Sequence, residues 1–465
     1  MKKINLLLSV LGFLLPLTVM AVEVNDVTGM TPVQVAAVVQ PESTQQVVDI
    51  VKKATGPISI AGGKYSMGGQ TAIQGAVQID TRKLNHVIDF KPEQKLLTIE
   101  TGATWHQVQE LIDPYDLSVK IMQSYANFSI GGSLSVNVHG RYIGEGPIIL
   151  SVKQFKIVLA DGKVVIASPE QNQDIFYGAI GGYGGLGIIT EVTLQLADNV
   201  KVKRFSKAMP IANYYEYFKQ NIRSDSKSIF HNAVIYPPDY KRVRSVTYKQ
   251  TEEPLTILER LRSDDKKNQN LEKPIKIVSS SSIGKNLRKL FDDFYYIKKP
   301  VMWRNYEASY DVSYLQPIAT KNKSFVLQEY FIPVEQFDHF YPKLVTILKK
   351  NKVNVINISI RHANQDSGSL LAWAKSEVFA FVIYYQQDTD ELSKQHVGNW
   401  TRELIDAVLE NQGSYYLPYQ LHATTEQFQR AYPQAEQFFK LKARLDPHNK
   451  FSNMLLKRYH IETVQ

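Results

Sequence analysis

The chain has 465 residues and a formal net charge of +9, with 44% hydrophobic residues, 21% charged residues and no cysteine. A chain of this length is too long to fold around one hydrophobic core, so we expect two or three domains. The ordinary composition excludes a disordered or fibrous protein. Disulfides, thiolate metal sites and cysteine nucleophiles are excluded, and we expect no metal site. The charge favours anionic partners, such as phosphorylated ligands or a membrane surface, and no basic-aromatic motif indicates nucleic acid.

The N-terminus has the pattern of a secretory signal peptide. Lys2 and Lys3 precede an apolar run over 4–19, and Ala21 lies where signal peptidase would cleave. We therefore expect residues 1–21 to be removed and the mature protein, with a charge of +7 after loss of two lysines, to be periplasmic or secreted. A retained membrane anchor is the alternative, because the apolar stretch is marginally long.

Residues 22–200 predict a mixed α+β domain with many short strands. It opens with a strand at 33–39, a helix that starts near Ser43 and runs to Lys53, and a strand at 57–60. The later elements expected in this domain are strands at 77–80, 86–90, 96–100 and 188–196, a helix at 104–112, a hairpin at 152–167 and a helix at 171–180.

Residues 201–416 have a different texture and predict a second domain. Strand patterns at 324–332, 353–360 and 378–385 alternate with long helical patterns, which indicates an antiparallel sheet covered by helices on one side. Residues 417–465 form a closing segment with a predicted helix over 428–443. The fold class expected is therefore α+β with two domains.

A glycine-rich loop follows the strand at 57–60. Glycines at 62 and 63 would let backbone N–H groups converge on a phosphate, and Lys64 and Ser66 would add a charge and a hydroxyl donor. An ordinary surface turn explains paired glycines equally well, so this loop alone does not establish a phosphate site.

Two further glycine clusters follow. Residues 129–141 are dense in small residues, which would let a flat ring or sugar lie against the backbone, and they include His139. A lone histidine is more often structural than catalytic. Residues 182–187 match G-x-G-x-x-G, but a helix is expected before them and a strand after them, the reverse of a nicotinamide-binding motif.

In this order and spacing, the three clusters resemble the PCMH-type FAD-binding domain of the vanillyl-alcohol oxidase family. The resemblance covers about 31–200 and is nearest to aldonolactone and alditol oxidases and decaprenylphosphoryl-ribose oxidase. The segments 415–419 and 445–453 resemble the C-termini of those enzymes. The resemblance implies an FAD-binding domain over 22–200, a substrate domain over 201–416 and a C-terminal segment, 417–465, that returns to the FAD domain.

The resemblance also assigns the cofactor site. It places the loop 62–67 at the FAD pyrophosphate, Ile189 at the adenine, and His139 and Tyr416 at the flavin. Tyr65 stands where many relatives attach FAD through a histidine, so we expect non-covalent FAD. The cofactor-binding residues expected are Gly62, Gly63, Lys64, Tyr65, Ser66, Met67, Ser124, Ser129, Ile130, Gly131, Gly132, Ser135, His139, Gly187, Ile189 and Tyr416.

The candidate catalytic residues are His139, Glu329, Arg361 and Tyr419. Strand alternation puts Gln328 on the opposite face from Glu329, which is then either a solvent-facing acid on an edge strand or a buried acid near the flavin. Arg361 either holds substrate oxygens and balances charge on reduced flavin or makes a surface ion pair. Tyr419 stands where the ribose oxidase has a lysine, which weakens that analogy.

The expected activity is oxidation of a carbinol C–H by hydride transfer to flavin N5, with His139 or Glu329 as the base. The substrate class is a polyol, sugar or lactone, with a lipid-phosphate-linked sugar included. A flavin-dependent reductase of an unsaturated bond and a non-catalytic periplasmic binding protein are the alternatives.

Two sequence features bear on electron acceptors and partners. The resemblance implies that Val138, the residue before His139, lies near the flavin edge that oxygen must reach. There its branched side chain would block oxygen and favour a membrane electron acceptor; an ordinary core valine is the alternative. The amphipathic stretch 283–294, with Lys285 and Arg288 opposite Leu287 and Phe291, would rest on a membrane or pack on its own protein.

Overall fold

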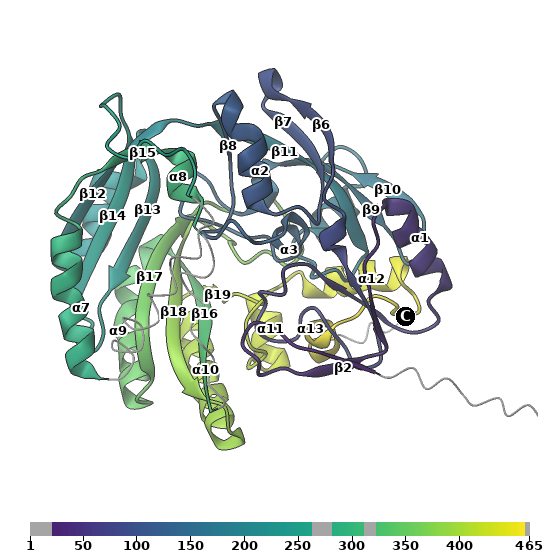
Figure 1. Cartoon of the computed structure of the whole chain (residues 1–465). Coiled ribbons are helices and arrows are strands. Elements are labelled where there is room, and N and C mark those ends of the chain that lie inside the picture. The colour runs from purple at the N-terminus through teal and green to yellow at the C-terminus, as the bar shows by residue number, and fades with distance from the viewer. Residues whose placement is uncertain (1–20, 263–280, 311–321, 461–465) are drawn as a thin grey trace, which may run out of the picture.

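The computed structural model describes residues 21–262, 281–310 and 322–460 (Figure 1). The predicted signal peptide therefore lies outside the described residues except for Ala21. Among the described helices, none has the length and apolar character needed to cross a bilayer.

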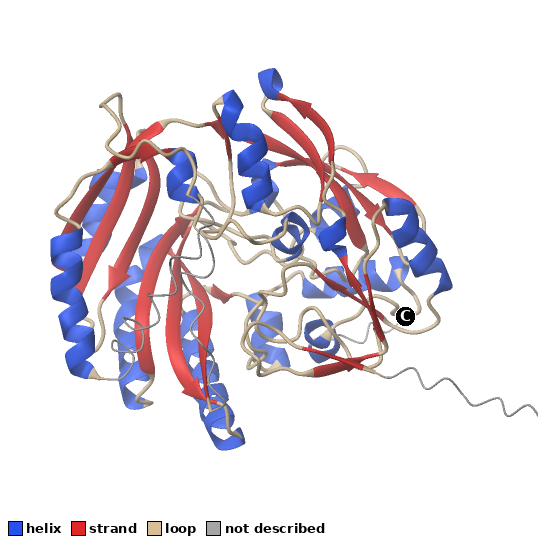
Figure 2. Ribbon diagram, viewed as in Figure 1, coloured by secondary structure: helices blue, strands red, loops and turns tan. Residues whose placement is uncertain are grey.

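The N-terminal half contains a parallel sheet and a larger antiparallel sheet, together with a small two-stranded antiparallel sheet, β1-β2 (Figure 2). The parallel sheet has the order β3-β5-β4, and the antiparallel sheet has the order β10-β9-β11-β7-β6, with β8 paired to β11. The bounds are β3 Ala37–Val39, β4 Ile58–Ala61, β5 Val77–Asp80, β6 Val87–Lys91, β7 Leu96–Glu100, β8 Leu117–Val119, β9 Val152–Val158, β10 Val164–Ala167 and β11 Ile188–Asp198.

Local sequence signals account for the helices of this half. Helix α1 (Thr44–Lys53) begins where the Ser43 side chain accepts a hydrogen bond from Gln46 N, and Thr104 forms a capping box at α2 (Trp105–Ile112). Helix α4 (Gln173–Ala179) precedes the third glycine cluster and β11 follows it, as predicted, so the nicotinamide interpretation fails on context. Helix α3 (Ile130–Ser135), inside the second cluster, was not predicted, because two of its six residues are glycine.

Two predicted elements are wrong in detail. The strand expected at 33–39 is two strands, β2 (Val33–Val35), which pairs with β1 (Val22–Val24), and β3, which pairs with β5. The single helix expected over 428–443 is instead α11 (Thr425–Ala431) and α12 (Ala435–Leu445). Pro433 lies between them, and proline disfavours a helical conformation in the residue before it.

The second half is an eight-stranded antiparallel sheet with the order β15-β12-β14-β13-β17-β18-β16-β19. Helices α9 (Phe337–Lys350) and α10 (Glu391–Glu410) cover one face, where Phe337 packs on Phe381 and Trp400 on Tyr385. The predicted α+β fold is thus confirmed. The strand bounds are β12 Lys201–Pro210, β13 Ser228–Ile235, β14 Arg242–Gln250, β15 Val301–Trp303, β16 Lys323–Pro333, β17 Asn354–Ala363, β18 Val378–Asp388 and β19 Ser414–Tyr415.

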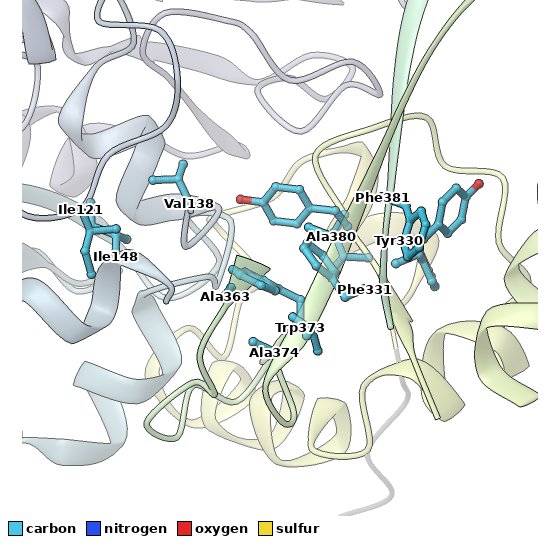
Figure 3. Close-up of a cluster of buried hydrophobic side chains, with 14 of the residues drawn as sticks. Ile121, Val138, Ile148, Tyr330, Phe331, Ala363, Trp373, Ala374, Ala380 and Phe381 are labelled. Carbon is cyan, nitrogen blue, oxygen red and sulfur yellow. The ribbon is translucent and has the colours of Figure 1, made fainter. Parts of the chain in front are cut away.

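The remaining helices are α5 (Tyr214–Phe218), α7 (Ser282–Tyr295), α8 (Arg304–Ala308) and α13 (Met454–Arg458). The chain after α10 returns to the N-terminal half, where Ile58 N donates to Lys450 O at 2.7 Å and the buried Lys442 ammonium donates to Gly185 O at 3.1 Å. One hydrophobic cluster joins both halves: Val138 and Ile148 come from the first half, and Phe331 and Trp373 from the second (Figure 3).

Candidate active site

A cavity of about 1450 Å³ lies between the glycine clusters and the face of the large sheet opposite α9 and α10. It has two walls, which we call the glycine wall and the sheet wall. The predicted site residues on the glycine wall are Gly62, Gly63, Lys64, Tyr65, Ser66, Met67, Ser124, Ser129, Gly131, Gly132, Ser135, Val138, His139, Gly187 and Ile189. Those on or beside the sheet wall are Glu329, Arg361, Tyr416 and Tyr419.

Ile130 is the exception among the predicted residues. Its side chain is fully buried in the hydrophobic core, and its backbone N donates to Ala103 O at 2.9 Å. As the first residue of α3, it turns inward while its neighbours Ser129 and Gly131 face the cavity. The Ile130 side chain therefore does not line the cavity, and its contact with the cofactor stays a prediction.

The first glycine loop approaches the N-terminus of α3 closely. Gly63 N donates to Ser129 Oγ at 3.3 Å, and a Cβ on Gly62 would collide with that same hydroxyl. At Gly63 a Cβ would lie 2.7 Å from the Tyr65 ring. The loop needs glycine at both positions, and its backbone lines the cavity together with the ammonium-bearing Lys64, whose pKa is lowered by burial.

The rest of the glycine wall offers flat and polar surfaces to a ligand. Tyr65 stacks on Phe128 with ring centroids 4.1 Å apart. Ser124 Oγ is buried at the cavity and has no hydrogen-bond partner among the described residues. A buried hydroxyl without a partner is costly unless a ligand or water satisfies it. Glycine loop, aromatic plate and unsatisfied hydroxyl fit the pyrophosphate, rings and sugar of FAD.

Three predicted catalytic side chains meet at the sheet wall. His139 Nε2 and Glu329 Oε1 lie 2.6 Å apart, and the Tyr419 hydroxyl donates to Glu329 Oε2 at 3.1 Å. They come from the second glycine cluster, from β16 and from the C-terminal segment, so only the fold brings them together. Glu329 is 3% exposed, which excludes the solvent-facing alternative.

The Glu329 carboxyl is held in its ionised form. Burial alone would raise its pKa, but the adjacent His139, the Arg361 charge and the hydrogen bond from Tyr419 outweigh burial and hold the pKa below its usual value. Burial, with the neighbouring carboxylate, raises the pKa of Tyr419, which stays a neutral donor. Because a carboxylate only accepts hydrogen bonds, we assign the shared proton to His139 Nε2.

Arg361 extends this cluster along the cavity. It lies on β17, lines the cavity, and makes no ion pair with any carboxylate in the described parts of the chain. Its Nε is buried and has no hydrogen-bond partner there. The surface ion-pair interpretation is therefore wrong. On the opposite face of β16, Gln328 Nε2 donates to Tyr385 and Thr401, as the alternation predicted.

A second polar cluster in the cavity was missed. Arg141 NH1 donates to Glu307 Oε1 at 2.8 Å, and the Tyr310 hydroxyl donates to Glu307 Oε2 at 3.3 Å. All three residues line the cavity. Arg141 ends the second glycine cluster, so the sequence could have indicated it as a site residue. Glu307 belongs to the short α8, which no sequence pattern predicts.

Comparison with known proteins defines the class. Residues 35–168 match the FAD binding domain family, which makes the N-terminal half a PCMH-type FAD-binding domain and confirms the predicted cofactor. Residues 192–459 match the D-arabinono-1,4-lactone oxidase family. That second match covers more than half of the chain, so the chain belongs to the D-arabinono-1,4-lactone oxidase family, and the resemblance stated above is confirmed.

Individual relatives align over about a third of the chain. A Neurospora crassa protein named "Putative D-arabinono-1,4-lactone oxidase" is 31% identical over 34% of this chain and 29% of its own length. Cytokinin dehydrogenase 2 of Arabidopsis thaliana is 25% identical over 37% of this chain and 35% of its own length. Cytokinin dehydrogenase 5 of the same plant is 28% identical over 36% of this chain and 33% of its own length. The chain thus spans about a third of the length of these curated relatives.

Proposed function

We propose that this protein is an FAD-dependent oxidoreductase that removes a hydride from a carbinol carbon of a polyol, sugar or lactone. The observation that carries the proposal is the buried Glu329 carboxylate, bonded to His139 and Tyr419, in the same cavity as the glycine loop. Membership in the D-arabinono-1,4-lactone oxidase family supports the substrate class.

The chain's own residues would handle the proton and the orientation. The Glu329 carboxylate accepts the hydroxyl proton as the carbinol becomes a carbonyl, and His139 and Tyr419 fix its two oxygens. Bound FAD would supply the hydride acceptor, which no side chain can provide. The Arg361 guanidinium, with its unsatisfied Nε, would hold a substrate oxygen or balance negative charge.

The aromatic residues around His139 would keep water from this proton transfer. The His139 ring lies 4.9 Å from Trp373 and 5.6 Å from Phe331, centroid to centroid, and its side chain is 2% exposed. In such a low-dielectric setting the hydrogen bond between His139 and Glu329 is held firmly in one geometry.

The test is anaerobic reduction of the bound flavin by a panel of polyols, sugars and aldonolactones. We expect at least one member to bleach the flavin spectrum of the wild type, while Glu329→Gln keeps its flavin and resists bleaching. Flavin that no carbinol reduces would contradict the proposal and favour the reductase or the non-catalytic alternative.

We further propose that the enzyme acts in the periplasm or outside the cell and passes electrons to an acceptor other than oxygen. The signal-peptide pattern at 1–21 supports the location. Val138 lines the cavity beside His139 and is 5% exposed, a position from which a β-branched side chain would obstruct small molecules. N-terminal sequencing of the protein from fractionated cells should begin at Val22, and a chain with intact Met1 found in the cytoplasmic fraction alone would contradict the export proposal.

A further inference from the structure

Helix α7 is mounted with its charged side toward the protein and its apolar side toward solvent. A helix on the surface of a soluble protein normally does the reverse and buries its apolar stripe. Ile283, Leu287, Leu290, Phe291 and Phe294 recur at the spacing of one helical face, and each is exposed. Phe291 is 71% exposed and Phe294 73%.

Named hydrogen bonds fix this orientation. Lys285 Nζ donates to Asn354 Oδ1 at 2.8 Å, and Arg288 NH1 donates to Ile356 O at 2.9 Å. On the next turn, Tyr236 donates to Asp292 at 2.8 Å, and Arg242 and Arg244 pair with Asp293. Several polar contacts to the ends of β13, β14 and β17 therefore hold the helix, which cannot rotate its apolar face inward without breaking them.

The exposed apolar face is concentrated and continues past the helix. Of the 16 large hydrophobic residues that are exposed in the described chain, seven lie between Ile283 and Ile297. We call these seven the α7 patch: Ile283, Leu287, Leu290, Phe291, Phe294, Tyr295 and Ile297. A patch of this kind on a monomer marks an interaction site. Figure 1 shows α7 at the outer edge of the molecule, on the side opposite the N-terminal half.

Positive charge borders the α7 patch. Lys298 and Lys299 follow Ile297 directly and are exposed, and neither is paired with a carboxylate among the described residues. The Lys299 ammonium lies 5.7 Å from the ring centroid of Phe205, itself 36% exposed. Apolar and aromatic side chains with flanking lysines are the combination that binds the interface of an anionic bilayer.

We propose that α7 docks this protein on an anionic membrane surface, with the α7 patch in the interface and Lys298 and Lys299 at the lipid phosphates. Lys298 and Lys299 favour an anionic surface over a second copy of the chain as the occupant. Lipid phosphates pair with both lysines, whereas a two-fold contact would bury the same apolar patch of a second copy and offer them apolar side chains. Leu287, Phe291 and Tyr295 also line the cavity, so the docked protein would turn this edge of the cavity toward the lipid.

Sedimentation of the full-length mature chain with vesicles tests the proposal. Vesicles of phosphatidylglycerol and phosphatidylcholine are compared with vesicles of phosphatidylcholine alone, at low and high salt. The variant Phe294→Asn/Ile297→Asn changes two patch residues that do not line the cavity. The matched control is Leu392→Asn, since Leu392 is 78% exposed on α10, away from the patch.

We expect the wild type and Leu392→Asn to bind the anionic vesicles in a salt-sensitive way, and Phe294→Asn/Ile297→Asn to bind at least about tenfold more weakly. Lys298→Gln and Lys299→Gln should each weaken binding about fivefold. Thermal melting and flavin content, unchanged in all variants, show that the fold is intact.

Absence of vesicle binding by the wild type would overturn the proposal, as would binding that the α7 variants leave unchanged. A wild-type dimer in light scattering that the Phe294→Asn/Ile297→Asn variant dissociates, without vesicle binding by either, would assign the face to a second copy and overturn it too. None of these outcomes depends on the oxidoreductase activity.

Discussion

The two walls of the cavity are built in different ways. The glycine wall consists of loops in which neighbouring residues act together, such as 62–67 and 129–135. The sheet wall consists of single side chains from strands and segments far apart in the sequence, such as Glu329, Arg361 and Tyr419. The first wall offers backbone and shape to a cofactor, and the second offers charge to a substrate.

The role of a histidine–glutamate pair therefore depends on whether it faces the cavity. A second histidine–glutamate pair joins His362 on β17 with Glu377 just before β18, Nε2 to Oε1 at 2.7 Å, and does not line the cavity. It is joined by Arg223 instead of a tyrosine. The two pairs are alike in distance, so a comparison between them separates chemistry from structural support.

Glu329→Gln should have the largest effect on turnover. We expect the rate of flavin reduction to fall about 10²–10⁴-fold, because the proton acceptor is lost while the shape is kept. In the matched variant Glu377→Gln, the rate of flavin reduction should stay within a few-fold of the wild-type rate. Stopped-flow reduction measures both, and equal losses in the two variants would erase the distinction between the pairs.

The glycine wall is tested by Gly63→Leu. A side chain there meets the Tyr65 ring, and we expect FAD affinity to fall about tenfold to a hundredfold. The control is Gly56→Leu, since a Cβ on Gly56 meets no atom within 4 Å. Flavin retained by Gly63→Leu at the wild-type level would show that this loop is not part of the cofactor site.

Tyr419→Phe should have a smaller effect, about tenfold on turnover, because it removes one hydrogen bond to a buried carboxylate. Loss of the donor also removes one of the causes that lower the Glu329 pKa. The acidic limb of the pH profile should therefore move to higher pH in this variant. An acidic limb at the wild-type pH would show that Tyr419 does not lower the pKa of Glu329.

The pH dependence of the wild type follows from the same carboxyl. The pKa of Glu329 lies below the ordinary value of 4.5, so the carboxyl stays ionised at pH 5 and above. The active form is lost only as the pH falls through that lowered pKa. Flavin reduction should thus show no loss assignable to Glu329 between pH 5 and 7. A limb in that range that disappears in Glu329→Gln would contradict the assignment.

The smallest change expected is at Val138, which concerns the oxidative half-reaction alone. Val138→Gly should accelerate reoxidation by oxygen and leave reduction by substrate unchanged, since removing the branched side chain opens a path. Rapid reoxidation of the wild type would refute the dehydrogenase proposal. An unchanged reoxidation rate in the glycine variant would show that Val138 does not block oxygen, without bearing on the dehydrogenase proposal.

The glycine wall leaves a clearer local pattern in the sequence than the sheet wall because the physical demands on the two walls differ. Close approach at Gly62 and Gly63 requires glycine locally, and this leaves a readable pattern. The inward turn of Ile130 could not be read from the sequence, because one turn of helix decides which of two neighbours faces the cavity. Glu307 left no pattern at all, since its burial depends on Arg141, a residue 166 positions away.

The most direct test of the account is the flavin content of the purified chain before and after acid precipitation. FAD held by the cavity without a covalent link, as Tyr65 predicts, gives a yellow protein and a yellow acid supernatant, with one FAD released per chain. A colourless protein that takes up no added FAD would contradict the cofactor site, and flavin that stays in the acid pellet would contradict the non-covalent attachment.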